Sequence, residues 1–95
     1  MTQMTQVLVQ TKGFELTVAL EKACQNGARK LLKYDSALQK AEFFLSGSNK
    51  KGFCAKLILI DNEKNLFFEY RDKSDLYQAI KDVCTKAKEE LSERK

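Results

Sequence analysis

The fold is decided by residues 37–71, which read ALQKAEFFLSGSNKKGFCAKLILIDNEKNLFFEYR. Apolar and polar side chains alternate in three short runs, at 37–46, 53–61 and 66–71. A period of two is typical of strands that bury one face. The loop 47–52 is polar and has glycine at both ends, and a second polar turn separates the last two runs. The stretch therefore predicts three consecutive antiparallel strands.

The segments on either side of this meander complete an α+β pattern. A β-branched run predicts a first strand at residues 5–11, and apolar residues at helical spacing predict a helix at 18–34, with Thr17 as its N-cap. After the meander, Ser74 is predicted to cap a second helix, and Asp75 suits the positive end of its dipole. The order β-α-β-β-β-α in one 95-residue domain predicts a two-layer sandwich, a four-stranded sheet with both helices on one face.

The composition argues against catalysis. The chain has no histidine, so a Ser-His-Asp triad, a Cys-His pair or a histidine metal site cannot be built. The three cysteines, Cys24, Cys54 and Cys84, form no CxxC pair, which favours reduced core thiols in a cytoplasmic protein. Only Cys54 is predicted to face outward, and a thiol enzyme or redox sensor would depend on it. We expect no enzyme activity, no catalytic residue, no cofactor and no metal site.

The positive charge is concentrated on the first predicted helix, within a net charge of +4. Lys22, Arg29 and Lys33 share one stripe of that helix at about 100° per residue. On the second helix, Lys81 and Lys88 lie on one flank and the acidic residues lie on another. Two such helices side by side predict a basic surface around a shared groove, extended by the lysines of the loop 47–52. That surface either binds phosphates or is an ordinary solvated exterior.

Three local strings have a familiar order and spacing: ELT followed by AL within residues 15–20, KLLKY at 30–34, and SDLYQAI at 74–80. With the β-α-β-β-β-α order, they resemble the ribosome hibernation-promoting factor family, also called ribosome-associated translation inhibitors. The last string is similar to the family's acidic-Asp-Met-Tyr-x-Ala-Ile entry to its final helix. The resemblance covers nearly the whole chain and is to the short form, which lacks the C-terminal dimerising domain.

The resemblance implies a cytoplasmic protein of the stress response that binds the small ribosomal subunit and its rRNA. Such proteins occupy the decoding channel, exclude tRNA and messenger RNA, and stop translation in idle cells. They are not enzymes, need no cofactor and have no membrane partner. The family's matching basic positions in this chain are Lys30, Lys33 and Lys86. With the two stripes, the predicted RNA-binding residues are Lys22, Arg29, Lys30, Lys33, Lys81, Lys86 and Lys88.

Three positions depart from the family pattern. Gly27 stands where the family often has a basic residue, and Glu89 and Glu90 fall in a stretch usually rich in Lys, Arg and Gln. An acid is repelled in a phosphate-facing groove, so we expect an altered contact map. Gly27 also weakens the helix by up to about 1 kcal/mol relative to alanine. Either it allows a close approach to the sheet, or it has no such role.

The alternative function is a protein-interaction or homodimerising module. The sheet face away from the helices is predicted to carry four large apolar residues beside Lys56, Glu69 and Arg71. Such a face indicates a partner surface, or else scattered surface apolar residues. The four residues are Phe44, Ile58, Ile60 and Phe67.

Overall fold

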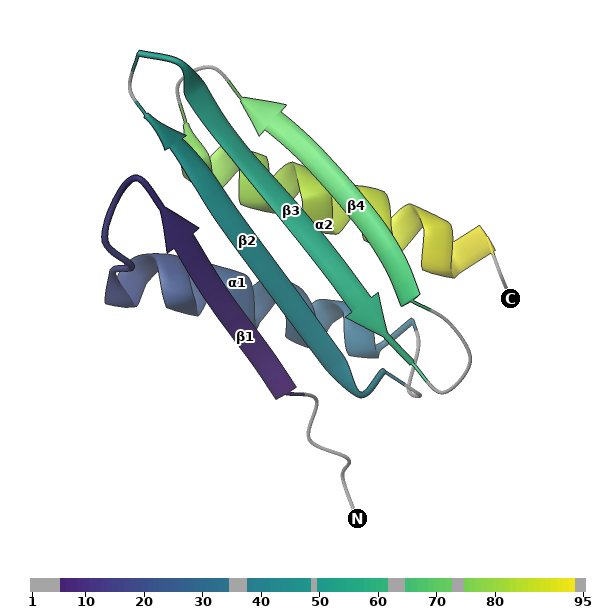
Figure 1. The fold of residues 1–95 in the computed structure, drawn as a ribbon. Helices are drawn as coiled ribbons and strands as arrows, with labels where there is room; N and C mark the ends of the chain where they lie inside the picture. The colour runs from purple at the N-terminus through teal and green to yellow at the C-terminus, as the bar shows by residue number, and fades with distance from the viewer. Residues whose placement is uncertain (1–5, 35–37, 49, 62–64, 73–74, 94–95) are drawn as a thin grey trace.

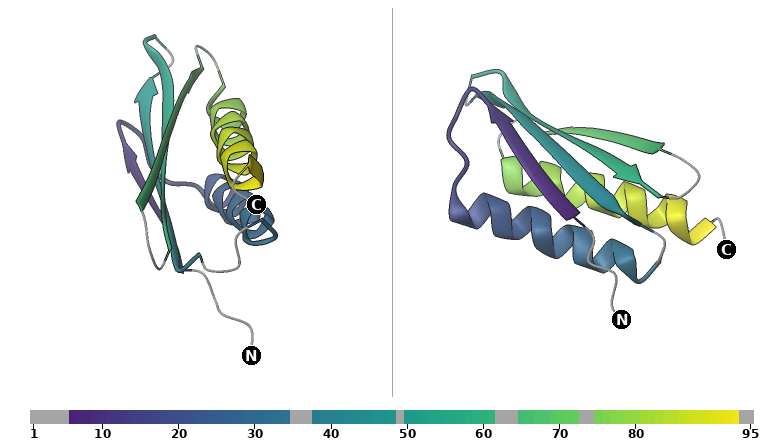
Figure 2. Two further views of the ribbon diagram at one scale, coloured as in Figure 1. Left: turned by 90° about the vertical axis from the view of Figure 1, so that its right-hand side faces the viewer. Right: turned by 60° about the horizontal axis from the view of Figure 1, so that its bottom comes forward.

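The computed structural model describes residues 6–34, 38–48, 50–61, 65–72 and 75–93. Its elements, in chain order, are β1 (Gln6–Lys12), α1 (Val18–Leu32), β2 (Lys40–Ser48), β3 (Gly52–Ile60), β4 (Asn65–Asp72) and α2 (Leu76–Glu93). The strands form one sheet in the order β1-β2-β3-β4, with β1 parallel to β2 and the other pairs antiparallel. Both helices cover one face of that sheet (Figures 1 and 2). The predicted α+β sandwich is confirmed.

The core lies between the sheet and the helices, on the face that the alternation predicts. Every second residue is buried from Ala41 to Leu45 in β2 and from Ala55 to Leu59 in β3, with Phe43 fully enclosed. The helices meet this face with Leu20, Cys24, Ala28 and Leu31 of α1 and with a longer stripe of α2. The sheet residues that are buried are Ala41, Phe43, Leu45, Ala55, Leu57 and Leu59.

The β2–β3 hairpin is tighter than the sequence predicts. The two strands pair as far as Ser48 and Gly52, so half of the expected loop 47–52 belongs to the ladder. Gly47 has a φ of +129°, and a Cβ there would collide with the carbonyl oxygen of Gly52 and with the Cα of Phe53. Only glycine combines this backbone angle with so close a contact. Gly47 therefore allows the two strands to stay paired up to the end of the hairpin.

Polar side chains cap the start of each helix. The Oγ1 atom of Thr17 accepts a hydrogen bond from the backbone N–H of Leu20 at 3.1 Å, as predicted. At α2, Oδ1 of Asp75 accepts from the N–H groups of Tyr77 and Gln78, at 2.9 and 3.4 Å. Asp75 therefore satisfies N–H groups of the first turn, whereas the predicted cap Ser74 lies outside the described residues. These caps help to set where each helix begins.

Candidate nucleic-acid interface

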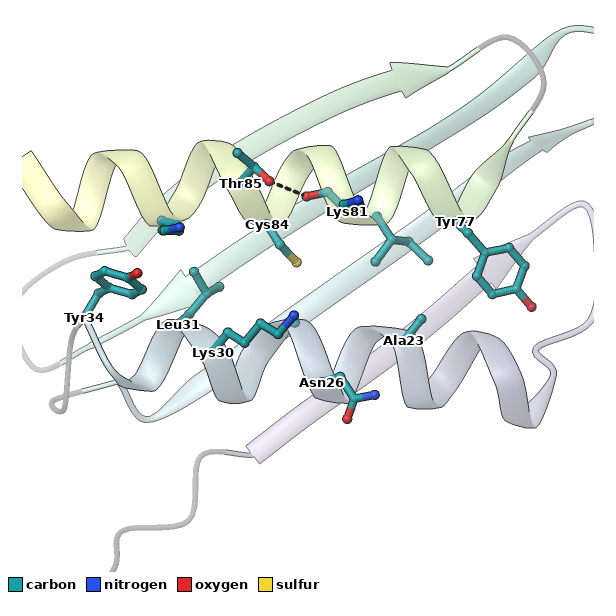
Figure 3. Close-up of a pocket in the computed structure, with 12 residues that line it drawn as sticks. Ala23, Asn26, Lys30, Leu31, Tyr34, Tyr77, Lys81, Cys84 and Thr85 are labelled. Carbon is teal, nitrogen blue, oxygen red and sulfur yellow. Dashed lines mark hydrogen bonds between the residues drawn. The ribbon is translucent and has the colours of Figure 1, made fainter.

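A groove of about 350 Å³ lies between α1 and α2 (Figure 3). Three of the predicted basic residues line it: Lys30 from α1, and Lys81 and Lys88 from α2. All three side chains are exposed. The rest of the lining is mostly apolar or aromatic, formed by Ala23, Asn26, Gly27, Leu31, Tyr34, Tyr77, Ile80, Cys84 and Thr85.

The two helices approach each other closely at one point of the groove. A Cβ atom added to Gly27 would lie 2.6 Å from Sγ of Cys84, a separation that real Cβ atoms essentially never show. Gly27 therefore gives α1 room beside α2. The predicted close approach of Gly27 to the sheet was wrong. The close neighbour of Gly27 is Cys84 on the other helix.

The lysines lie at the rim of the groove, and one of them, Lys88, lies over an aromatic ring. Nζ of Lys88 lies 5.7 Å from the ring centre of Tyr34, within the range of a cation–π interaction. Tyr77, about half exposed, lines the groove as well, and Figure 3 shows it and Tyr34 toward opposite ends. The groove therefore joins a cationic rim to an apolar floor with an aromatic ring toward each end.

The other predicted basic residues lie elsewhere. Lys22, Arg29 and Lys33 are exposed but do not line the groove, and their helical spacing sets them away from the buried stripe of α1. Lys86 lies on the β4 side of α2, with Nζ 5.3 Å from the ring centre of Tyr70. The predicted set is thus divided into a groove group, an outer stripe on α1 and a single lysine beside the sheet.

The acidic residues of α2 lie away from this groove. No carboxylate is found among its lining residues in the described part of the chain. Asp82 accepts a hydrogen bond from Nε2 of Gln78 at 2.9 Å, on the same helix. Glu89 and Glu90 are exposed outside the groove. The repulsion expected from these two residues therefore does not arise at the groove lining.

The cysteines differ more than the sequence predicts. All three are free, but only Cys24 is buried, and Cys84 is partly open to the groove. Burial raises the pKa of Cys24 to about 12, and burial also raises that of Cys84 to about 12, against a lowering contribution from Lys30. A thiol with so high a pKa is a poor nucleophile near neutral pH. Cys54 is half-buried on the outer sheet face, as predicted.

Within the ranges that the structure describes, no group of three or more histidine, cysteine, aspartate or glutamate side chains could hold a metal ion. None of the helices in those ranges is long and apolar enough to cross a membrane. The groove residues that sequence reasoning missed are Tyr34, Tyr77 and Asn26. Tyr77 lies four positions before Lys81 and eleven before Lys88, which at about 100° per residue places it on nearly the same flank of the helix. The helical period could therefore have identified it.

A two-layer α+β domain with a lysine-rimmed groove between its helices is the class that these observations define. Residues 7–95 match the family described as Sigma 54 modulation protein / S30EA ribosomal protein, and the chain belongs to that family. The resemblance to ribosome hibernation-promoting factors is thereby confirmed.

Solved structures share the fold. The N-terminal domain of Thermus thermophilus Protein Y superposes with a TM-score of 0.83 at 20% identity, covering 97% of this chain and 100% of that one. A ribosomal subunit interface protein from Coxiella burnetii gives a TM-score of 0.83 at 9% identity, covering 95% and 97%. No curated protein sequence matches the chain.

Proposed function

We propose that the protein is a ribosome-associated translation inhibitor that binds small-subunit rRNA through the groove between α1 and α2. Family membership supports ribosome association, and one protein of the same fold is a ribosomal subunit interface protein from Coxiella burnetii. The observation that carries the site is the groove itself, whose rim has three lysines and no carboxylate among the described lining residues. Bound in the decoding channel, the domain excludes tRNA and messenger RNA by its bulk.

The groove suits phosphate recognition. Lys30, Lys81 and Lys88 carry compact charges on flexible stems, which bind phosphate oxygens without the fixed geometry of arginine. Contacts to phosphates position a protein on RNA but read no sequence. Folded RNA that presents several phosphates across a concave surface is therefore the fitting ligand. The activity is occlusion in the cytoplasm and calls for no covalent step and no cofactor.

The basic residues on the exposed side of α1 supply additional, weaker contacts to RNA. Lys22, Arg29 and Lys33 form a stripe on the exposed side of α1, beside the groove and not inside it. In a channel walled by RNA they face phosphates on a neighbouring segment. We assign them a smaller share of affinity than the groove lysines, because a convex surface brings fewer phosphates within reach.

A pair of substitutions on α2 tests the site. Lys81→Glu changes a groove lysine, and Lys86→Glu changes a lysine of the same helix on the β4 side. Co-sedimentation with small subunits on a sucrose gradient, repeated at several salt concentrations, measures both. We expect Lys81→Glu to lower affinity at least tenfold and to flatten the salt dependence, since it removes a phosphate contact.

The outcomes separate cleanly. If the wild-type protein stays at the top of the gradient at low salt, the proposed function is wrong. If Lys86→Glu weakens binding as much as Lys81→Glu, the groove is not the interface. Homodimerisation through the sheet face stays a prediction, which light scattering over a range of protein concentrations tests. A monomer throughout would exclude it.

A further inference from the structure

A second concentration of positive charge lies on the opposite layer of the domain, on the outer face of the sheet that Figure 1 presents to the viewer. The strand register sets Lys12, Ser46, Cys54 and Arg71 in one row across all four strands. Lys56 follows one row further along the face, between Phe44 and Glu69. Cations from β1, β3 and β4 therefore converge toward the β2–β3 hairpin.

These side chains border two adjoining hollows. The first, of about 480 Å³, is lined by Lys51, Lys56 and Arg71 together with Ser46. The second, of about 570 Å³, shares Ser46 and Lys56 with the first and continues to Lys12 and Phe67. Lys51 belongs to the loop that was predicted to extend the basic surface around the helical groove. It lines the first hollow instead, on the sheet layer of the domain.

Two of these cations make long ion pairs with one carboxylate. Glu69 lies 3.7 Å from Nζ of Lys56 and 3.8 Å from Nε of Arg71. The side chain of Arg71 is 78% exposed. Exposed ion pairs contribute little to stability, so a phosphate competes readily for both cations.

A large aromatic side chain continues this surface. Phe67 is 60% exposed, which is unusual for a phenylalanine, and it lies in the second hollow. It stands four residues before Arg71 on β4, about 13 Å away at the rise of an antiparallel strand. An exposed ring on a sheet beside cations is the arrangement on which unpaired bases stack while their phosphates bind lysine and arginine.

We propose that the outer sheet face binds single-stranded RNA. The phosphates lie in the hollows lined by Lys12, Lys51, Lys56 and Arg71, and one base stacks on Phe67. This surface goes beyond the helical groove, which lies on the other layer of the domain. The two surfaces together allow one small domain to hold two RNA segments at once.

A second copy of the chain fits this face less well. In a twofold dimer the same patch meets itself, so the cations Lys12, Lys56 and Arg71 would approach their own symmetry mates. Duplex RNA fits less well too, because its bases are already stacked and present no free face to Phe67. An unpaired strand satisfies both the ring and the charges.

The test uses a fluorescein-labelled 12-nucleotide oligouridine and measures its binding by anisotropy at several salt concentrations. Phe67→Ala removes the stacking ring and should weaken binding about 5- to 150-fold, the usual effect for one stacked base. Arg71→Gln should reduce the slope of log affinity against log salt by about 0.7, the value for one phosphate of a single strand. Circular dichroism confirms that each variant is folded.

Lys40→Gln is the matched control. Lys40 lies at the far end of the same face and, like Arg71, contacts a carboxylate, at 2.7 Å from Glu42. It borders neither hollow, so its removal should leave the slope unchanged. Cys54, which lines the first hollow, supplies a second readout, because bound oligouridine should slow its alkylation by iodoacetamide in the wild type and not in Phe67→Ala.

Two results would overturn the inference. Oligouridine binding that neither Phe67→Ala nor Arg71→Gln changes would remove this face as an RNA site. Self-association that Phe67→Ala abolishes would assign the face to a second copy. Neither result bears on the groove, because the gradient experiment with Lys81→Glu tests that site separately.

Discussion

The two faces of the domain sort their charges in different ways. On the helical face, Lys81 and Lys88 line the groove while Asp82 and Glu89, their immediate neighbours in sequence, lie outside it. On the outer sheet face, Lys56 and Glu69 are direct partners across two strands. A helix turns about 100° per residue and separates adjacent residues onto different flanks, whereas strands bring alternate residues together on one face.

This difference teaches that the charge of an element says little about the surface that it presents. Acids outnumber bases in the sequence of α2, four to three, yet its groove flank is basic among the described residues. On the sheet face near the hairpin, the cations Lys12, Lys56 and Arg71 outnumber the carboxylate Glu69. The predictions below test how far the two faces differ, beginning with the largest effect.

The thiols should show the sharpest contrast. The pKa of Cys24 and of Cys84 is raised to about 12 by burial, so only about one molecule in ten thousand carries either thiolate at pH 8. Cys54 is half-buried on the sheet face and lines a hollow there. We expect a disulfide reagent at pH 8 to modify one thiol in a fast phase, more than about a hundredfold faster than the others.

The substitution Cys54→Ser should remove that fast phase completely. A fast phase that persists in this variant would mean that the helical thiols are open to solvent. Mass spectrometry of the labelled peptide identifies the residue directly and does not depend on the rates.

The same raised pKa values predict a loss of stability in alkali. The unfolded thiol ionises near pH 8.5, whereas the folded thiols stay protonated until about pH 12. Their contribution is therefore complete below about pH 8.5 and is lost as the pH rises toward 12, by up to about 1.4 kcal/mol per pH unit for each thiol. Urea unfolding at pH 8 and pH 10 should show a smaller decrease in Cys84→Ala than in the wild type. Equal decreases would contradict the burial of Cys84.

The contact between Gly27 and Cys84 should appear as a coupling free energy. Gly27→Ala gains up to about 1 kcal/mol of helix propensity but loses about 1–3 kcal/mol to the clash with Sγ. In the Cys84→Ala background the new Cβ meets only the Cβ atom at 3.6 Å, which is ordinary contact. The same change should then stabilise the protein. A double-mutant cycle from urea unfolding measures the coupling, and additive effects would show that the helices can separate at this point.

The helix caps should contribute about equally on the two sides of the groove. Asp75→Ala removes the acceptor for the N–H groups of Tyr77 and Gln78 and should lower the free energy of unfolding by about 1 kcal/mol. Thr17→Ala should cost a similar amount at α1. Thermal denaturation of both variants provides the comparison. A negligible effect for Asp75→Ala would assign the cap of α2 to another residue.

Local patterns predict most of this fold, because their signals lie within a few residues. The alternation around Phe43 identifies the buried face, and Thr17 identifies a helix start. The contact of Gly27 with Cys84 could not be predicted, since it depends on how two helices far apart in sequence align. Lys86 and Lys88 are both predicted RNA-binding residues, although residues two positions apart lie about 200° apart around a helix. The structure places them on different flanks of α2, as that helical period implies.

The smallest predicted effects on stability are those of Lys88 and Lys86. Each lies over a tyrosine ring, Lys88 at 5.7 Å from Tyr34 and Lys86 at 5.3 Å from Tyr70. Replacement of either by glutamine should lower the free energy of unfolding by about 0.5–1 kcal/mol, the usual value of an exposed cation–π contact. Their effects should add, because the two lysines lie on opposite flanks of α2.

The two substitutions should therefore have similar effects on the free energy of unfolding but different effects on RNA binding. Lys88→Gln should flatten the salt dependence of small-subunit binding by about one phosphate contact, whereas Lys86→Gln should leave it nearly unchanged. Equal slopes would mean that the basic surface wraps around α2. In that case both flanks of α2 would contact RNA. The helical face would then resemble the sheet face, because neither would have a sharp boundary between cations that bind RNA and cations that do not.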